Sequence, residues 1–350
     1  MKKIALLLVV CMMVVSLSAC GKGEVNEQGY YNQINVYNWG DYMAPGVIED
    51  FEKEYGIKVN YEEYPTNEDM QAKIKQGGTE YDVIFPSEYM IEAMKKEGLL
   101  QELDYNNLPN FKNIDDNLKD FTYDQKNKYS IPYLYGTMGI LYNKKKVKEP
   151  VDSWNILWNE KYKGQIIMLD SPRDTIGITL KKLGYSLNTK DIKELEEAQK
   201  ELIKQKPLVK AYLVDEYRNI MIAGEAAMSL VWSGEAIRIA NENEDLAYAI
   251  PNEGTNLWFD GMAIPTTSKH KREAELFINY MMRPDVAKKT AETIGYATAN
   301  KEAVKLLPEE MRNNKGLYPD GDILNEGEVF NDLGEFTTEY DRVWTEIKSY

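Results

Sequence analysis

The sequence of 350 residues has few of the side chains that most often carry catalysis or bind transition metals. It has one histidine, His270, in the polar stretch TTSKHKREAE, where a surface position is expected. A Ser-His-Asp triad needs a histidine beside a nucleophile and an acid, and a zinc site needs several His or Cys ligands. No G-x-S-x-G, Walker A, dinucleotide-binding glycine motif or D-x-D-x-D-G calcium loop occurs. These absences argue against an enzyme, and we expect neither a metal nor a cofactor.

Positive charge is also scarce. The formal net charge is -15, with 42 Lys and Arg against 57 Asp and Glu. Nucleic-acid binding needs clustered Lys and Arg, so no nucleic-acid partner is expected. The acidity is compatible with a cationic ligand, although solubility alone accounts for it more simply. Hydrophobic residues make up 43% of the chain, enough for real cores, and the length suggests about two domains.

The N-terminus has the pattern of an export signal. Lys2 and Lys3 precede an apolar run over residues 4–15, which is too short for a stable membrane span. The following LSAC, residues 17–20, resembles the lipobox of bacterial lipoproteins. This resemblance implies that residues 1–19 are a signal peptide and that Cys20 carries a lipid. The simpler alternative is a secretory signal with a chance cysteine.

The cysteine count agrees with lipidation. The only other cysteine, Cys11, would leave with the signal peptide, so the mature chain could form no internal disulfide. The polar residues after Cys20 indicate a flexible tether up to residue 32. No later stretch of the sequence is long and apolar enough to cross a membrane. The body is therefore expected outside the cytoplasmic membrane, on its periplasmic or cell-surface face.

Strands and helices are predicted to alternate after the tether. Strands are predicted at 34–37, 57–64 and 81–86, and helices at 45–56, 67–78 and 87–98. Asn67 and Ser87 are predicted as N-caps of the last two helices. This β-α-β-α-β-α order predicts an α/β fold with a mostly parallel sheet and helices on both faces.

A second α/β pattern follows. Strands are predicted at 137–143 and 165–170, a capped helix at 153–164, a helix at 190–204, and a strand running into a helix at 226–236. The segments 246–251 and 257–265 are predicted to pair as strands, before helices at 271–284 and 284–295.

Aromatic and acidic side chains gather at the predicted strand exits. Trp39, Trp232 and Trp258 each have a carboxylate close by in sequence, whereas Trp154, Trp158 and Trp344 fit core positions. The carboxylates are Asp41, Glu235 and Asp260, and SPRDT adds Asp170 and Asp174. Any one of these residues alone fits a core or surface role better. Together, at the edge where ligands bind such sheets, they favour a ligand with positive charges on a hydrocarbon chain.

Several motifs also occur in the order found in bacterial polyamine-binding proteins. They are YNWGDYMAPGVIEDFEKEYGIKV, YDVIFPSEYM, YSIPYLYGT, SWNILWNEKYKG, WFDGMAIP, RPDVAKKTAETIGYATAN and LYPD. From about residue 33 to the end, the chain resembles the spermidine/putrescine-binding subunits of ABC importers.

The resemblance implies a two-lobed periplasmic-binding-protein fold with a ligand cleft between the lobes. Hinge crossovers are expected near residues 138, 258 and 306. The implied first lobe comprises residues 33–137 and 259–305, and the second lobe comprises residues 138–258 and 306–350.

The resemblance also implies the ligand residues. Trp39 and Tyr42 would wall the polyamine chain, Ser87 and Tyr89 would hydrogen-bond an amine end, and Asp260 would hold an ammonium group. The remaining implied ligand residues are Asp174, Trp232, Trp258 and Tyr296. The sequence departs from the family pattern at Ser171, where a second carboxylate is usual, and at Phe330, where an amide is usual.

The leading hypothesis is a lipid-anchored, monomeric receptor that binds spermidine or putrescine, or both, and delivers it to an ABC permease. A receptor of the same fold for a sugar or an amino acid is an alternative, with Arg173 as the one plausible partner for an amino-acid carboxylate. A lipid-anchored hydrolase using Asp170 and Asp174 as an acid/base pair is a weaker alternative.

Overall fold

The computed structural model describes residues 25–214, 216–319, 321, 323 and 327–350, so the predicted signal peptide and Cys20 lie outside the described residues. The strands are β1 (Gln33–Trp39), β2 (Lys58–Tyr64), β3 (Val83–Ile84), β4 (Ser130–Asn143), β5 (Ile166–Leu169), β6 (Val209–Leu213), β7 (Met228–Trp232), β8 (Leu246–Ala249), β9 (Leu257–Ala263) and β10 (Ala297–Thr298).

The α-helices are α2 (Val47–Tyr55), α3 (Asn67–Gln76), α4 (Glu88–Lys96), α5 (Pro172–Leu183), α6 (Ile192–Gln205), α7 (Tyr217–Ile222), α8 (Ser233–Glu242), α9 (Lys271–Met281), α10 (Pro284–Ile294), α11 (Lys301–Leu306), α12 (Glu309–Arg312) and α14 (Thr337–Ser349).

The N-terminal β-α-β-α-β-α prediction is confirmed. β1 pairs in parallel with β2 over its whole length and with β3 on its other side. Ile34 and Val36 of β1 are fully buried and Tyr37 is almost so, as expected of the buried strand predicted here. Parallel pairing brings the carboxyl ends of β1 and β3 to the same edge, so the segments after Trp39 and Ile84 are neighbours.

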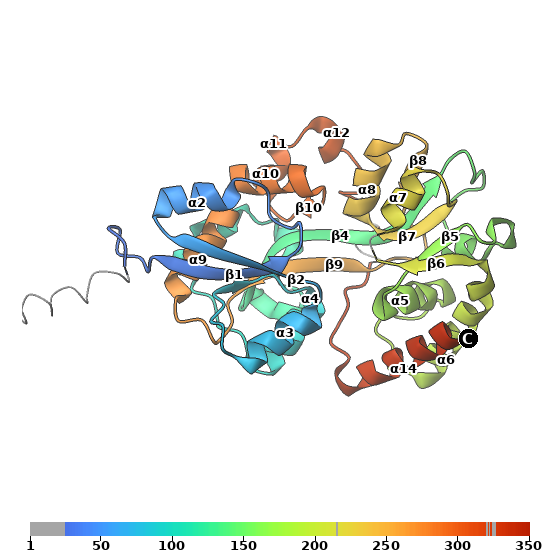
Figure 1. Cartoon of the computed structure of the whole chain (residues 1–350), viewed down its shortest axis with the longest axis horizontal. Helices are drawn as coiled ribbons and strands as arrows, with labels where there is room; N and C mark the ends of the chain where they lie inside the picture. Colours follow the sequence, from blue (N-terminus) through green and yellow to red (C-terminus); the bar gives the residue numbers. More distant parts are fainter. Residues whose placement is uncertain (1–24, 215, 320, 322, 324–326) are drawn as a thin grey trace, which may run out of the picture.

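β4 runs through the middle of the molecule (Figure 1). Its first part, from Ser130 to Thr137, pairs with β9, and its second part, from Met138 to Tyr142, pairs with β7. Among the described residues, the strands form one ten-stranded sheet, with β2-β1-β3-β9-β4-β7-β5-β6 as its main order.

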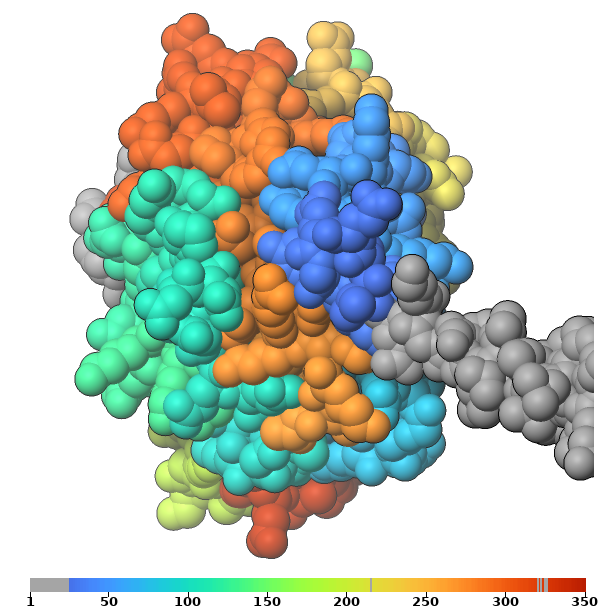
Figure 2. Space-filling model, turned by 90° about the vertical axis from the view of Figure 1, so that its left-hand side faces the viewer, coloured from blue at the N-terminus to red at the C-terminus, as the bar shows by residue number. Residues whose placement is uncertain are grey.

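The sheet joins two lobes (Figure 1). The apolar core of the first lobe is drawn from residues 34–135 and 257–299, and that of the second from residues 138–246. A smaller cluster unites α5, α6 and α14 on the second lobe. On the end face of the first lobe, the orange segment containing α9 lies between the blue N-terminal segment and the green segment that follows α4 (Figure 2). The exact lobe boundaries given above stay a prediction.

Three local predictions are wrong. Residues 153–164 form two short 3-10 helices, Trp154–Trp158 and Glu160–Tyr162, instead of one helix. β8 and β9 do not pair with each other, because each pairs with a different part of β4. Helix α3 is capped by Thr66, whose hydroxyl accepts from the Asp69 N–H, and not by Asn67.

Ser87 does occupy the N-cap position of α4, but its side chain makes no capping hydrogen bond. Helix α5 was not predicted, although Ser171 caps it and Pro172 opens it. Within the described ranges, no helix has the length and apolar character needed to span a membrane.

Candidate functional site

The side chain of Asp260 lies at the centre of a polar cluster in the first lobe. Asp260 is 7% exposed and accepts hydrogen bonds from the Tyr42 hydroxyl (2.6 Å) and the Ser87 hydroxyl (2.7 Å). Burial raises the pKa of Asp260 to about 6, and these two hydrogen bonds partly oppose the shift. The cluster therefore holds a carboxylate that is ionised at neutral pH and, within the described part of the chain, has no cation as a hydrogen-bond partner.

Backbone geometry brings the three residues together. Ser87 and Asp260 form an antiparallel bridge, and the Gly261 N–H donates to the Pro86 carbonyl at 2.9 Å. Tyr42 reaches them from the loop after β1, where Asp41 adopts a positive φ of 53°. The buried Asn38 holds this loop, because its amide donates to the Tyr42 carbonyl and its oxygen accepts from the Trp39 N–H.

The cluster continues to Tyr89 through a residue that was not predicted. The amide of Asn67 donates to the Ser87 hydroxyl at 3.1 Å and to the Tyr89 hydroxyl at 3.0 Å. Tyr89 in turn donates to Glu68 at 3.2 Å. Asn67 was expected to cap α3, and a capping role and a site role are indistinguishable in sequence, since both use the same short amide.

A second buried carboxylate lies in the second lobe. Asp174, in the first turn of α5, accepts from the Ser171 hydroxyl at 2.7 Å, and the nearby Trp232 side chain helps to lower its pKa. Burial raises its pKa to about 6, while these contacts and the charge of Arg173 act in the opposite direction. Ser171, where the family pattern has a carboxylate, thus supports Asp174 and also caps α5.

Aromatic rings pack together beside Asp260 and reach the second lobe. Tyr296 packs edge-on against Trp258, with ring centroids 5.0 Å apart, and lies 6.1 Å from the Tyr42 ring. Its ring presses so closely on Gly234, two residues after Trp232, that a Cβ there would lie 2.1 Å away. The indole nitrogen of Trp258 is buried and has no hydrogen-bond partner, so the ring presents an unused donor within the site.

Trp39 is the predicted site residue with the least direct link to the carboxylates. Its indole N–H donates to the Phe85 carbonyl at 2.8 Å, and its ring lies 4.6 Å from that of Tyr64. Tyr64 donates to the same carbonyl at 2.6 Å. These contacts fix the Trp39 ring at the exit of β1 and β3.

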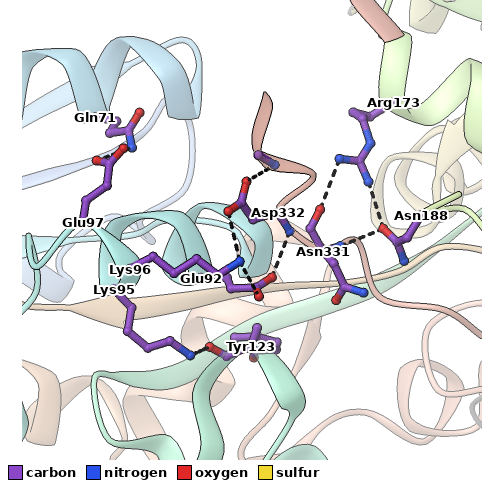
Figure 3. A network of polar contacts seen from close by, with 11 residues as sticks. Gln71, Glu92, Lys95, Lys96, Glu97, Tyr123, Arg173, Asn188, Asn331 and Asp332 are labelled. Atoms are coloured by element: carbon purple, nitrogen blue, oxygen red, sulfur yellow. Dashed lines mark hydrogen bonds and ion pairs between the residues drawn. The ribbon is translucent and has the colours of Figure 1, made fainter. Parts of the chain in front are cut away.

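A segment near the C-terminus links the lobes beside this site (Figure 3). Arg173 donates to the Asn331 carbonyl at 3.2 Å and to Asn188 at 3.0 Å. The Asp332 N–H donates to Glu92 of α4 at 2.9 Å, and the Asp332 carboxylate pairs with Lys96 at 3.1 Å. Residues 331–332 thus bridge α5 of the second lobe and α4 of the first.

Phe330, the other departure from the family pattern, is buried next to this bridge. The guanidinium of Arg173 lies 4.5 Å from its ring centroid, within the range of a cation–π contact. Arg173 is therefore engaged by Phe330, Asn331 and Asn188, which does not favour a role as partner of a ligand carboxylate.

The geometry also weakens the hydrolase alternative. Asp170 is exposed and pairs with Lys348 of α14 at 2.8 Å, whereas Asp174 is buried against Ser171 and Trp232. The two carboxylates therefore do not act as one acid/base pair. In the part of the chain that the structure describes, no three His, Cys, Asp or Glu side chains are grouped to hold a metal ion.

Two lobes joined through a shared sheet, each with a buried carboxylate and with an aromatic ring packed where they meet, are the architecture of a ligand-binding protein. The chain belongs to the bacterial extracellular solute-binding proteins, whose family model matches residues 46–318. The members of this family bind solutes and are not enzymes.

Several individual relatives are similar to this chain over about nine tenths of its length. The spermidine/putrescine-binding periplasmic protein of Escherichia coli (strain K12) is 41% identical over 321 residues, covering 91% of this chain and 92% of that protein. The solved structure of the spermidine/putrescine ABC transporter substrate-binding protein PotD from Streptococcus pneumoniae is 43% identical, with a TM-score of 0.84, covering 91% of this chain and 99% of that one. The TpPotD lipoprotein of Treponema pallidum is 27% identical, with a TM-score of 0.83, covering 90% of this chain and 99% of that one.

Proposed function

We propose that this protein is a receptor for a polyamine, spermidine or putrescine, which it delivers to an ABC permease. The observation that carries the proposal is the arrangement of Asp260 and Asp174. Each is a buried carboxylate that accepts hydrogen bonds from uncharged hydroxyl groups. The rings of Tyr42, Tyr296 and Trp258 pack together beside Asp260, and Tyr296 reaches Gly234 of the second lobe. The names of the relatives support the choice of ligand.

The chemistry of the site suits a cation with an apolar spacer. Burying an ammonium group is costly unless a carboxylate pairs with it, and Asp260 and Asp174 supply such partners. The rings of Trp258, Tyr296 and Tyr42 can cover methylene groups and attract cations through their faces. Trp39, Ser87, Tyr89 and Trp232 complete the proposed ligand residues.

Ligand capture would use a hinge motion between the lobes. We place the hinges near residues 138, 258 and 306, so that β4 and β9 bend as the lobes close. The packing of Tyr296 on Gly234 is a contact between the lobes that such a motion would make and break. The first lobe would comprise residues 33–137 and 259–305, and the second residues 138–258 and 306–350.

We also propose that Cys20 is lipidated after removal of residues 1–19, so that the receptor stays anchored as a monomer outside the cytoplasmic membrane. The lipobox-like LSAC supports this proposal, and one structural relative is named a lipoprotein. Mass spectrometry of the full-length protein expressed in a bacterium tests it, because the mature chain should begin at Cys20 and carry the added mass of acyl chains. A mature chain that begins elsewhere or carries no added mass would contradict it, and light scattering of the signal-less protein tests the monomer.

The binding function is tested by calorimetric titration of the signal-less protein, with Cys20 replaced, against spermidine and putrescine. One-to-one binding of either supports the proposal, and an uncharged sugar and an amino acid serve as controls. No heat with both polyamines, together with binding of one of the controls, would assign the site to another ligand.

A further inference from the structure

One buried carboxyl group beside the site has no role in the description so far. Glu88 is the first residue of α4, is 1% exposed and accepts a hydrogen bond from the Phe259 N–H at 2.9 Å. Among the described residues, no Lys, Arg or His forms an ion pair with it. A buried carboxyl group without a cation partner is costly to keep ionised, so its presence calls for an explanation.

Glu88 and the preceding residue, Ser87, both form hydrogen bonds with β9, the strand that carries Asp260. Ser87 donates to the Asp260 carboxylate, while Glu88 accepts from the backbone of Phe259, the residue before Asp260. The two contacts hold β9 just beyond the end of β3, next to the backbone hydrogen bond from Gly261 to Pro86. Glu88 therefore positions Asp260, through the strand, as well as placing a second carboxyl group close to it.

We propose that Glu88 is a positioning residue of the ligand site that is protonated in the free receptor and loses its proton when a cationic ligand binds at Asp260. This inference rests on the proposed function, because it needs a cation in the site. The ligand's charge would offset the repulsion between the two carboxylates, and the proton would pass to solvent. Ligand affinity would then rise with pH over the range in which Glu88 ionises.

The surrounding groups agree with this assignment. Burial raises the pKa of Glu88 to about 8; the nearby charge of Asp260 adds to the shift, and the Phe259 N–H and Arg173 oppose it. The other titratable groups around Glu88 are Tyr89 on its own helix and Tyr123. Burial raises the pKa of both phenols far above neutrality, so neither supplies the proton at neutral pH. Because Glu88 and Asp260 interact, the measured proton release belongs to the titration of the pair and not to Glu88 alone.

The test is calorimetric titration of putrescine and spermidine at pH 7.5 in two buffers with different ionisation enthalpies. The heat difference gives the number of protons released. Wild-type protein should release between about half a proton and one proton per ligand. Glu88→Gln keeps an oxygen to accept from Phe259 but cannot ionise, so its proton release should fall close to zero. Its ligand affinity should also change by no more than about twofold between pH 6.5 and 8.5, where that of the wild type rises by about tenfold or more.

Two further variants separate charge from structure. Glu88→Ala removes the acceptor as well, so it should weaken binding beyond Glu88→Gln and lower the melting temperature. Glu97→Gln removes an exposed carboxylate at the other end of α4, where it pairs with Lys75, and it should leave proton release unchanged. Binding with no proton release in the wild type, or with equal release in Glu88→Gln, would overturn the inference and leave the receptor function standing. Failure of both polyamines to bind would overturn both.

Discussion

Replacing Asp260 with Asn tests the proposed ligand site most directly. Asp260 is buried and accepts two hydrogen bonds at 2.6 and 2.7 Å, both of which an Asn side chain could retain after its hydroxyl partners reorient. The substitution therefore removes the charge while keeping the shape. A carboxylate and an ammonium group about 4 Å apart attract by about 4 kcal/mol at an effective dielectric constant of about 20. With the remaining dipole of Asn allowed for, we expect a loss of about 3 kcal/mol, or roughly 150-fold in Kd.

The same substitution should have the opposite effect on the stability of the free protein. An acid whose pKa is raised by folding contributes stability that is present at low pH and is lost as pH rises through the folded value, here about 6. At pH 7 the ionised Asp260 therefore destabilises the free receptor. Asp260→Asn should raise its free energy of unfolding by about 1–3 kcal/mol, estimated from the difference between pKa values of about 6 and about 3.9.

The assay combines calorimetric titration with polyamines at pH 7.5 and urea denaturation of the free protein. Asp341→Asn, which neutralises an exposed aspartate on α14, is the matched control and should change neither result. If Asp260→Asn binds within about threefold of the wild type, which is under 1 kcal/mol, the ammonium does not pair with this carboxylate. Weaker binding accompanied by lower stability would instead indicate a folding defect.

Three other predictions follow from the same contacts. The pKa values of Asp260 and Asp174 are about 6 in the free protein, so ligand affinity should fall as pH drops below 6. The fall should be up to about tenfold per pH unit for each carboxylate that takes up a proton. Titrations from pH 7.5 to pH 5 measure this, and constant affinity would contradict it. Trp258→Ala should weaken binding by about 1–2 kcal/mol through loss of the aromatic wall, measured by titration, and an unchanged Kd would exclude the ring from the site. Asp332→Ala should raise the ligand dissociation rate by less than about fivefold in stopped-flow experiments, because the half-exposed ion pair of Asp332 with Lys96 contributes under about 1 kcal/mol. A slower dissociation rate would contradict a role of this ion pair in keeping the lobes closed.

Much of the fold follows from sequence periodicity. The strand predicted at 34–37 is part of β1, and helices α2, α3 and α4 all lie within their predicted ranges. The failures involve tertiary contacts. Residues 153–164 have a helical pattern, but their backbone forms 3-10 turns, and the Trp154 indole donates to the Gly254 carbonyl. The pairing of β8 was missed because β4 accepts partners from both lobes, which no local pattern encodes.

The site residues likewise divide into those that the sequence predicted and those that only tertiary contacts reveal. Trp39, Tyr42, Ser87 and Asp260 were predicted from their places at strand exits and from the family resemblance, and the structure places the last three in direct contact. Asn67 and Glu88 were missed because each stands where a helix start would account for it. A short amide or an acid is common in the first turn of a helix. Only the fold therefore reveals that Asn67 contacts the hydroxyl of Ser87 and that Glu88 contacts β9.

The start of α4 shows how local helix stability is given up for the site. An N-cap serine that accepts from the first turn typically contributes about 1 kcal/mol, and Ser87 donates to Asp260 instead. Glu88 would ordinarily interact favourably with the positive end of the helix, but burial and the nearby Asp260 raise its pKa to about 8, so it is mostly protonated in the free protein. Both losses fall on the helix that also binds the inter-lobe segment through Glu92 and Lys96. A cation at Asp260 would favour the ionised form of Glu88 and so restore its interaction with the helix end. Ligand binding would thereby stabilise α4, the helix that binds the segment linking the two lobes.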